Sequence, residues 1–197
     1  MNISIQANPP VKAPHAEVED RDLAVRLARG DARALEQLIE RYQRRVAGLA
    51  ARLLAWADGA EDVTQSVFLA AWRRRAQFRH EARLWTYLAT ITVNTCRSLQ
   101  RRRWLEQSVR KWIAPLKRQA DGPSYQQLMV NEKSELVRAA VARLPQTYRE
   151  AVVLRYLEGM SIREVASLLG IKRNAVEARL SRARKLLETS LAPMCEE

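Results

Sequence analysis

Apolar residues recur at intervals of three and four along most of this chain, the spacing that gathers side chains on one face of an α-helix. This spacing predicts helices at about 22–29, 32–55, 60–76 and 83–104. The inner stripe predicted for the longest of the first three consists of Leu35, Leu38, Ile39, Tyr42, Val46, Leu49 and Leu53. In the 60–76 helix the residues predicted to face inward are Val63, Val67, Leu69 and Ala70. Strand-like alternation is hard to find, and Gly and Pro are few, so we predict an all-α fold.

The helical pattern breaks in two places and divides the chain. Residues 1–20 carry three prolines and no periodic apolar face, which predicts a disordered, mobile tail. Around Pro115 and Asp121-Gly122-Pro123 the pattern degrades, which is typical of a flexible linker. The predicted units are a tail at 1–20, a helical domain at 21–104, a linker at 105–130, a second helical domain at 131–191 and a tail at 192–197.

The second domain carries the signals of a helix-turn-helix. Ser161 can cap a short helix with Glu164 as its reciprocal partner, and Gly170 can end that helix. Asn174 can then cap a last helix. The inner face predicted for this last helix consists of Val176, Leu180, Ala183 and Leu187. Two short helices joined by a glycine turn place the second helix in the major groove of DNA.

The outer face of that last helix is basic and rich in hydrogen-bonding groups. An arginine such as Arg182 can read guanine, a glutamate such as Glu177 can accept from cytosine, and Arg179 and Lys185 suit phosphates. The candidate DNA contacts are Arg173, Asn174, Glu177, Ala178, Arg179, Ser181, Arg182 and Lys185. The alternative is a helical hairpin with a solvated basic face, but caps, turn, spacing and charge together favour DNA binding.

Composition supports a polyanionic partner and excludes several classes of protein. The net charge of +12 favours nucleic acid over a membrane surface. The longest apolar stretch, residues 46–57, is interrupted by Arg52 and is too short to span a bilayer. No secretory signal is visible, so we expect a cytoplasmic protein. Cys96 and Cys195 have no metal-ligand spacing, and no phosphate loop or nucleophile–base pair is present, so neither an enzyme nor a cofactor is expected.

The helix at 60–76 combines a polar strip with large apolar residues. Asp62, Gln65 and Ser66 lie beside Phe68 and Trp72 at helical spacing. One interpretation is ordinary amphipathicity, with carboxylates near the helix start complementing the macrodipole. The other is a docking face for a second protein, with a polar rim and apolar anchors. The residues alone leave both interpretations open.

Aromatic and cationic residues are mixed from residue 77 to residue 104. Phe78, Trp85, Tyr87 and Trp104 accompany several arginines. Single-stranded nucleic acid is held by this combination, because bases stack on aromatic rings while guanidinium groups meet phosphates. The alternative is that Trp85 and Tyr87 are core anchors and the arginines a solvated face, but nucleic-acid contact is favoured.

Taken together, the two halves resemble an extracytoplasmic-function (ECF) RNA polymerase sigma factor of the sigma-70 family. The segments ARGDARALEQLIERY, AEDVTQSVFLAAW and WTYLATITVNTCRSLQRRR resemble sigma region 2. The segment LPQTYREAVVLRYLEGMSIREVASLLGIKRNAVEARLSRARKLL resembles sigma region 4. The two in this order, separated by a short linker, are highly specific for the family.

The resemblance implies a subunit that binds core RNA polymerase and directs promoter-specific initiation, recognising −35 and −10 elements and helping to melt the DNA. It implies contacts with the clamp helices and flap of the polymerase, with promoter DNA and with an anti-sigma factor. The residues implied for clamp docking are Asp62, Gln65 and Phe68, and those for the −10 element are Phe78, Arg79, Asn94, Arg97 and Arg101. The outer face of the last helix would read the −35 element. A stand-alone helix-turn-helix regulator is the alternative, and whether specific binding requires core polymerase would decide.

Overall fold

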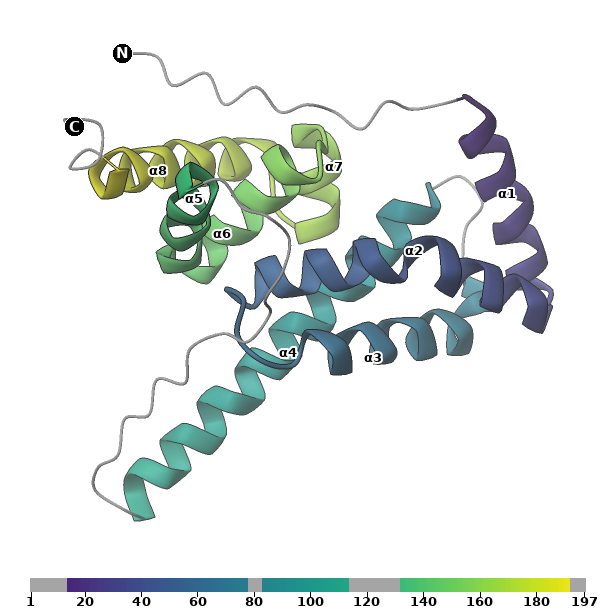
Figure 1. Ribbon diagram of the computed structural model, residues 1–197, viewed down its shortest axis with the longest axis horizontal. Coiled ribbons are helices and arrows are strands. Elements are labelled where there is room, and N and C mark those ends of the chain that lie inside the picture. Colours follow the sequence, from purple (N-terminus) through teal and green to yellow (C-terminus); the bar gives the residue numbers. More distant parts are fainter. Residues whose placement is uncertain (1–13, 78–82, 114–131, 192–197) are drawn as a thin grey trace.

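The computed structural model describes residues 14–77, 83–113 and 132–191, and each regular element in these ranges is a helix (Figure 1). The elements are α1 (Pro14–Ala28), α2 (Ala32–Leu53), α3 (Ala60–Arg73), a 3₁₀ turn η1 (Arg75–Gln77), α4 (Leu84–Ile113), α5 (Glu132–Arg143), α6 (Gln146–Val152), a π-helical turn η2 (Val153–Leu157), α7 (Ile162–Leu169) and α8 (Arg173–Leu191). The predicted all-α class is confirmed.

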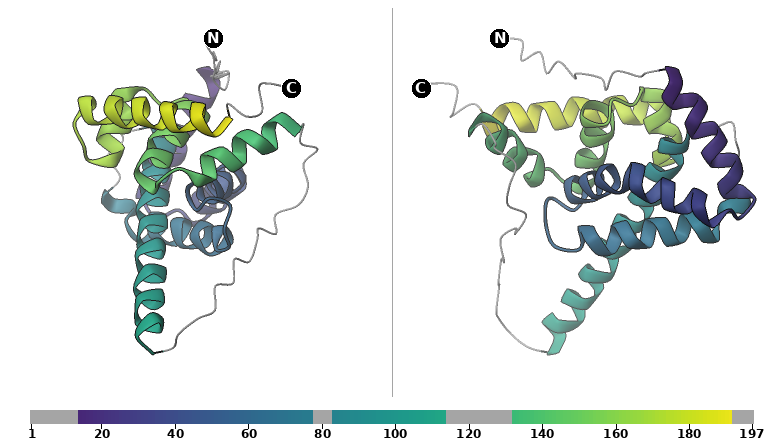
Figure 2. Two further views of the ribbon diagram at one scale, coloured as in Figure 1. Left: turned by 90° about the vertical axis from the view of Figure 1, so that its left-hand side faces the viewer. Right: turned by 45° about the vertical axis from the view of Figure 1, so that its right-hand side comes forward.

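In the first half, α2, α3 and α4 pack around one core and α1 lies across α2 (Figures 1 and 2). The predicted stripe of α2 supplies much of this core, because Leu38, Tyr42, Val46, Leu49 and Leu53 are buried. Leu35 and Ile39 are partly buried against it.

The first helix begins earlier than the sequence pattern indicated. Residues 14–20, expected in the tail, belong to α1, whereas residues 1–13 lie outside the described part. Arg41 of α2 donates to Glu19 and Asp20, and the Tyr42 hydroxyl donates to Asp20. These cross-helix contacts order a segment whose own apolar pattern is too weak to predict a helix.

The fourth helix also exceeds its predicted end. Residues 105–113, assigned to the linker, continue α4 to Ile113, while residues 114–131 lie outside the described part. No Gly or Pro interrupts this stretch before Pro115. Arg102 Nε donates to Glu106 Oε1 at 2.8 Å, a pair one helical turn apart. Residues with high helix propensity therefore extend α4, but they form no apolar face from which the sequence pattern could predict the extension.

The second half is the predicted helix-turn-helix. Ser161 and Glu164 form a reciprocal capping box at the start of α7, and Gly170 ends α7 with a φ of 68°. The expected cap of α8 is wrong by two residues. The Lys172 carbonyl already accepts from the Ala175 and Val176 amides, so Asn174 lies inside the first turn.

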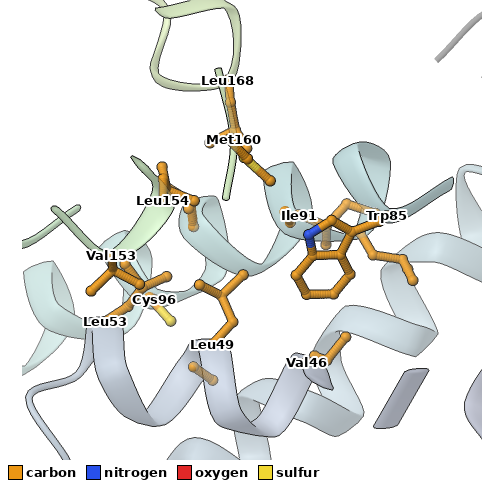
Figure 3. Close-up of a cluster of buried hydrophobic side chains, with 14 of the residues drawn as sticks. Val46, Leu49, Leu53, Trp85, Ile91, Cys96, Val153, Leu154, Met160 and Leu168 are labelled. Atoms are coloured by element: carbon orange, nitrogen blue, oxygen red, sulfur yellow. The ribbon is translucent and has the colours of Figure 1, made fainter. Parts of the chain in front are cut away.

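The two halves contact each other directly. Helix α2 contacts α6 and η2, and α4 contacts α7. Figure 3 shows Val153 beside Cys96 and Leu53, with Leu154 close to Leu49. The buried apolar residues of both halves consequently form one cluster.

Candidate nucleic-acid interface

The last helix, α8, presents the predicted polar face to solvent. Val176, Leu180 and Ala183 are buried on its inner side, against α5, α6 and α7. The exposed members of the predicted DNA-contacting set are Arg173, Asn174, Glu177, Ala178, Ser181, Arg182 and Lys185. Seven of the eight residues thus share an accessible surface. This surface offers both cationic groups and short hydrogen-bonding side chains.

Arg179 differs from the other seven. It is only partly exposed, and its Nη1 atom is buried and makes no hydrogen bond to any residue in the described ranges. Its position between Val176 and Leu180 explains this, because the side chain starts at the edge of the packed face. Only part of the guanidinium can therefore face a phosphate.

The turn before α8 is held by local contacts. The Ser161 amide and hydroxyl donate to Glu164 Oε2 at 2.8 and 2.7 Å, and the Glu164 amide donates back to Ser161 Oγ at 3.2 Å. Arg155 Nη1 donates to the Met160 carbonyl at 2.9 Å. These bonds fix α7, and the packing of α7 on α8 then fixes the direction of the exposed face.

Helix α4 carries the residues expected at the −10 element. Asn94 and Arg101 are exposed, whereas Arg97 is paired with Glu150 of α6. Phe78 and Arg79 lie outside the described residues. Trp104 is 65% exposed and lies three residues after Arg101 on α4, whose C-terminal part projects from the body (Figure 1). The exposed residues leave an aromatic and cationic surface along this helix.

Trp85 belongs to the core and is not available to stack on a base. It is buried and stacks on Tyr42, with ring centroids 6.1 Å apart. The Arg45 guanidinium lies 3.8 Å from the centroid of the Trp85 ring. The aromatic–cationic pattern at this position therefore stabilises the fold, the alternative left open above. Burial raises the pKa of the Tyr42 hydroxyl, which keeps it a neutral donor.

The pKa shifts around Arg97 reflect its pairing with the second half. Hydrogen bonding to Glu150 raises the pKa of Arg97. Burial, followed by the nearby Glu150 carboxylate, raises the pKa of the Cys96 thiol to about 12. Cys96 thus stays protonated and unreactive near neutral pH, as a small core residue.

Only part of the predicted docking set is exposed on the surface of α3. Asp62 and Gln65 are exposed, but Phe68 is 6% exposed and packs in the core. Leu69, predicted to face inward, is 55% exposed. Phe68 is therefore buried and not exposed as a docking anchor would be, and Leu69 is the exposed apolar side chain beside the polar strip. Phe68 and Leu69 are adjacent and both apolar, so the apolar pattern alone did not indicate which of the two faces the core.

Within the described residues, no group of three or more His, Cys, Asp or Glu side chains is arranged to hold a metal ion. The same part of the chain contains no helix with the length and apolar character needed to cross a membrane.

Comparison with known proteins places both halves in one family. Residues 38–106 match Sigma-70 region 2, and residues 134–187 match Sigma-70, region 4. The ECF RNA polymerase sigma-E factor of Haemophilus influenzae is 30% identical over 187 residues, which cover 90% of this chain and 98% of that protein. The RNA polymerase sigma-H factor of Pseudomonas aeruginosa is 30% identical over 187 residues, covering 91% and 97%.

Solved structures give the same assignment. CnrH in complex with the cytosolic domain of CnrY is similar with a TM-score of 0.64 and 31% identity, over 88% of this chain and 97% of that chain. The sigma factor RpoE in complex with the anti-sigma factor NepR from Bartonella quintana has a TM-score of 0.64 and 25% identity, over 80% and 96%. The chain therefore belongs to the ECF sigma factors of the sigma-70 family, non-enzymatic subunits that direct RNA polymerase to promoters.

Proposed function

We propose that three exposed surfaces of this sigma factor divide the work of initiation. The outer stripe of α3 docks on the clamp helices of the polymerase, α4 holds the melted −10 element through Asn94 and the basic residues that follow it, and the outer face of α8 reads the −35 element. The observation that carries the proposal is the exposure of seven polar or small residues on α8, opposite the buried Val176, Leu180 and Ala183.

The docking surface consists of Asp62, Gln65 and Leu69. These residues are spaced by three and four along α3, so they share one side of the helix. Leu69 offers an apolar anchor, and Asp62 and Gln65 form the polar rim that protein interfaces commonly show.

The −10 surface is assigned to Asn94, Arg97 and Arg101, spaced over two turns of α4. An exposed Asn94 amide can both donate to and accept from the edge of an extruded base. Arg101 can meet a backbone phosphate, and the exposed Trp104 ring can stack on an unpaired base. Phe78 and Arg79 remain part of the proposed set through the family resemblance.

The −35 surface is assigned to the eight predicted residues of α8. Arg182 and Glu177 are the proposed readers of base edges. Arg173 and Lys185 are exposed and suit phosphates, whereas Arg179 reaches one only with the outer part of its guanidinium.

CnrH and RpoE were solved with CnrY and with the anti-sigma factor NepR. We infer that an anti-sigma factor also binds this chain, and that region 4 meets the flap of the polymerase. A cytoplasmic location follows, because promoter DNA and the polymerase are found there.

Footprinting on one target promoter tests the proposal. The chain with core polymerase should protect both elements, and the chain alone should protect neither at the same concentration. Specific protection by the chain alone would instead support a stand-alone helix-turn-helix regulator.

A further inference from the structure

The turn between α2 and α3 has a backbone conformation that few residues adopt. Ala55 and Trp56 have φ values of 58° and 57°, and Gly59 has a φ of 102°. A left-handed conformation is unfavourable for a residue with a Cβ atom, and it persists where the surrounding structure determines it. This turn therefore needs contacts from outside itself.

Helix α4 supplies such contacts from one of its sides. Gln100 Nε2 donates to the Leu53 carbonyl at the end of α2, at 3.2 Å. Three residues further along α4, Arg103 Nη2 donates to the Asp58 carbonyl at 2.6 Å. Residues at this spacing project from the same side of a helix. Helix α4 consequently holds the turn at its start and near its end.

The space around Gly59 shows how closely α4 approaches the turn. A Cβ atom added at Gly59 would lie 2.9 Å from Arg103 Nη2 and 3.1 Å from Leu99 Cδ2. Both distances are shorter than an ordinary van der Waals contact, so a side chain at Gly59 would displace the Arg103 guanidinium. The absence of a side chain at Gly59 thus allows Arg103 to reach the Asp58 carbonyl.

The same turn determines where α3 begins. Gly59 is the cap residue of α3, and no side chain of the described residues caps the helix there. The Gly59 carbonyl accepts from the Val63 amide at 3.0 Å, so the turn is bonded to the first turn of α3. Asp62 belongs to this first turn, is exposed, and lines one depression together with Trp56 and Asp58. A turn released from α4 would therefore leave Asp62 less firmly placed.

The three consecutive arginines of α4 differ in what they contact. Arg101 and Arg102 are exposed, and Arg102 pairs with Glu106 on α4 itself. Arg103 is only partly exposed, and its guanidinium lies on the turn. Successive helical residues point about 100° apart, which explains the difference. Arg103 is consequently not free to meet a phosphate while it holds the Asp58 carbonyl.

We propose that Arg103 is a positioning residue for polymerase docking. Through the Asp58 carbonyl it holds the first turn of α3, and with it Asp62, in the orientation that binds the clamp helices. Arg103 acts through α3 and not by touching the polymerase. The proposal rests on the docking surface proposed above for α3.

Titration of fluorescent core polymerase with the full chain tests the positioning. Arg103→Met keeps the aliphatic stem but removes the donor to Asp58, and it should lower the affinity about fivefold. Arg103→Lys should recover part of the affinity, because an ammonium group can also donate to a carbonyl. Arg102→Met is the matched control, because it removes the same charge from a side chain paired on α4 itself. Equal affinities of Arg103→Met and Arg102→Met would overturn the proposal.

A double-mutant cycle distinguishes positioning from general stabilisation of the fold. If Arg103 acts through Asp62, Asp62→Lys should cost about threefold less affinity in the Arg103→Met background than in the wild type. Additive losses would overturn the proposal. Normal binding by Asp62→Lys alone would overturn the docking surface and the proposal with it. Weaker binding by Asp62→Lys with normal binding by Arg103→Met would overturn the positioning alone.

Hydrogen exchange of the free chain tests the turn without polymerase. The Val63 amide should exchange faster in Arg103→Met than in Arg102→Met, because its acceptor belongs to the released turn. Equal exchange would show that Arg103 does not hold the turn and would overturn the proposal. Circular dichroism verifies folding. If Arg103→Met loses helix, Gly59→Ala replaces it in every measurement, because its Cβ atom displaces the guanidinium of Arg103.

Discussion

Phe68 and Leu69 are neighbours on α3 with different environments: Phe68 is 6% exposed within the core, and Leu69 is 55% exposed. Successive residues of a helix are about 100° apart around its axis, so one step separates core from surface. This relationship decides which apolar residue of α3 is available to the polymerase.

We predict that Leu69→Ala combined with Asp62→Lys weakens binding to core polymerase by about tenfold, roughly 1.4 kcal/mol, while helicity is unchanged. The reason is loss of an apolar anchor and reversal of a rim charge. Fluorescence titration with core polymerase measures the effect. Glu36→Lys, an exposed site on α2, is the control for charge. Normal binding by the double variant would remove α3 from the docking surface.

Phe68→Ala should act on stability instead. Truncating this buried ring should lower the free energy of unfolding by about 3–5 kcal/mol, measured by chemical denaturation. A folded Phe68→Ala protein of normal stability that fails to bind polymerase would contradict the burial described here.

The sequence predicted those features that neighbouring residues determine, such as the ends of α7 and the outer face of α8. Ser161, Glu164 and Gly170 lie within ten residues of one another, and each acts on the backbone next to it, so the capping box and the end of α7 were predictable. The spacing of Val176 and Leu180 likewise defined the outer face of α8.

The features that were missed depend on distant residues. Asp20 of α1 pairs with Arg41 of α2, 21 positions away, and Arg97 pairs with Glu150, 53 positions away. Helical periodicity contains no information on which polar residues meet across such distances. The choice between Phe68 and Leu69 also depended on where the remaining helices pack.

The capping box of α7 should contribute measurably to stability. Ser161→Ala removes the acceptor of the Glu164 amide and should lower the free energy of unfolding by about 1 kcal/mol. Chemical denaturation provides the measurement. Ser181→Ala, on the exposed face of α8, should change it by less than about 0.5 kcal/mol. Equal effects of the two substitutions would contradict the capping role.

Asn94→Ala should impair promoter opening more than initial binding. An extruded base loses stacking worth a few kcal/mol, and the Asn94 amide is placed to bind its edge. Permanganate reactivity of the −10 thymines reports opening, and a pre-melted bubble is the control template. The defect should shrink on the bubble if Asn94 acts in melting and persist if it holds the open strand. Unchanged reactivity and transcription would remove Asn94 from the site.

Substitutions on the outer face of α8 should distinguish residues that read bases from residues that contact phosphates. Arg182→Ala should cost about 1–3 kcal/mol and relax preference at one −35 position. Arg173→Ala should weaken binding to all sequences and reduce the salt slope by about one, and Arg179→Ala should do so less because its Nη1 is buried. Titrations of polymerase holoenzyme on promoter variants at several salt concentrations compare them. The same sequence-independent loss for Arg182→Ala and Arg173→Ala would contradict the division.

Promoter-specific initiation is tested by transcription reconstituted from purified core polymerase and this chain on a library of genomic fragments, with start sites read by sequencing. We predict initiation at a limited set of promoters that share −35 and −10 elements, dependent on the chain and, at limiting concentrations of the chain, reduced in the Leu69→Ala and Asp62→Lys double variant. Start sites that are the same with and without the chain would contradict its function as a promoter-specific sigma factor.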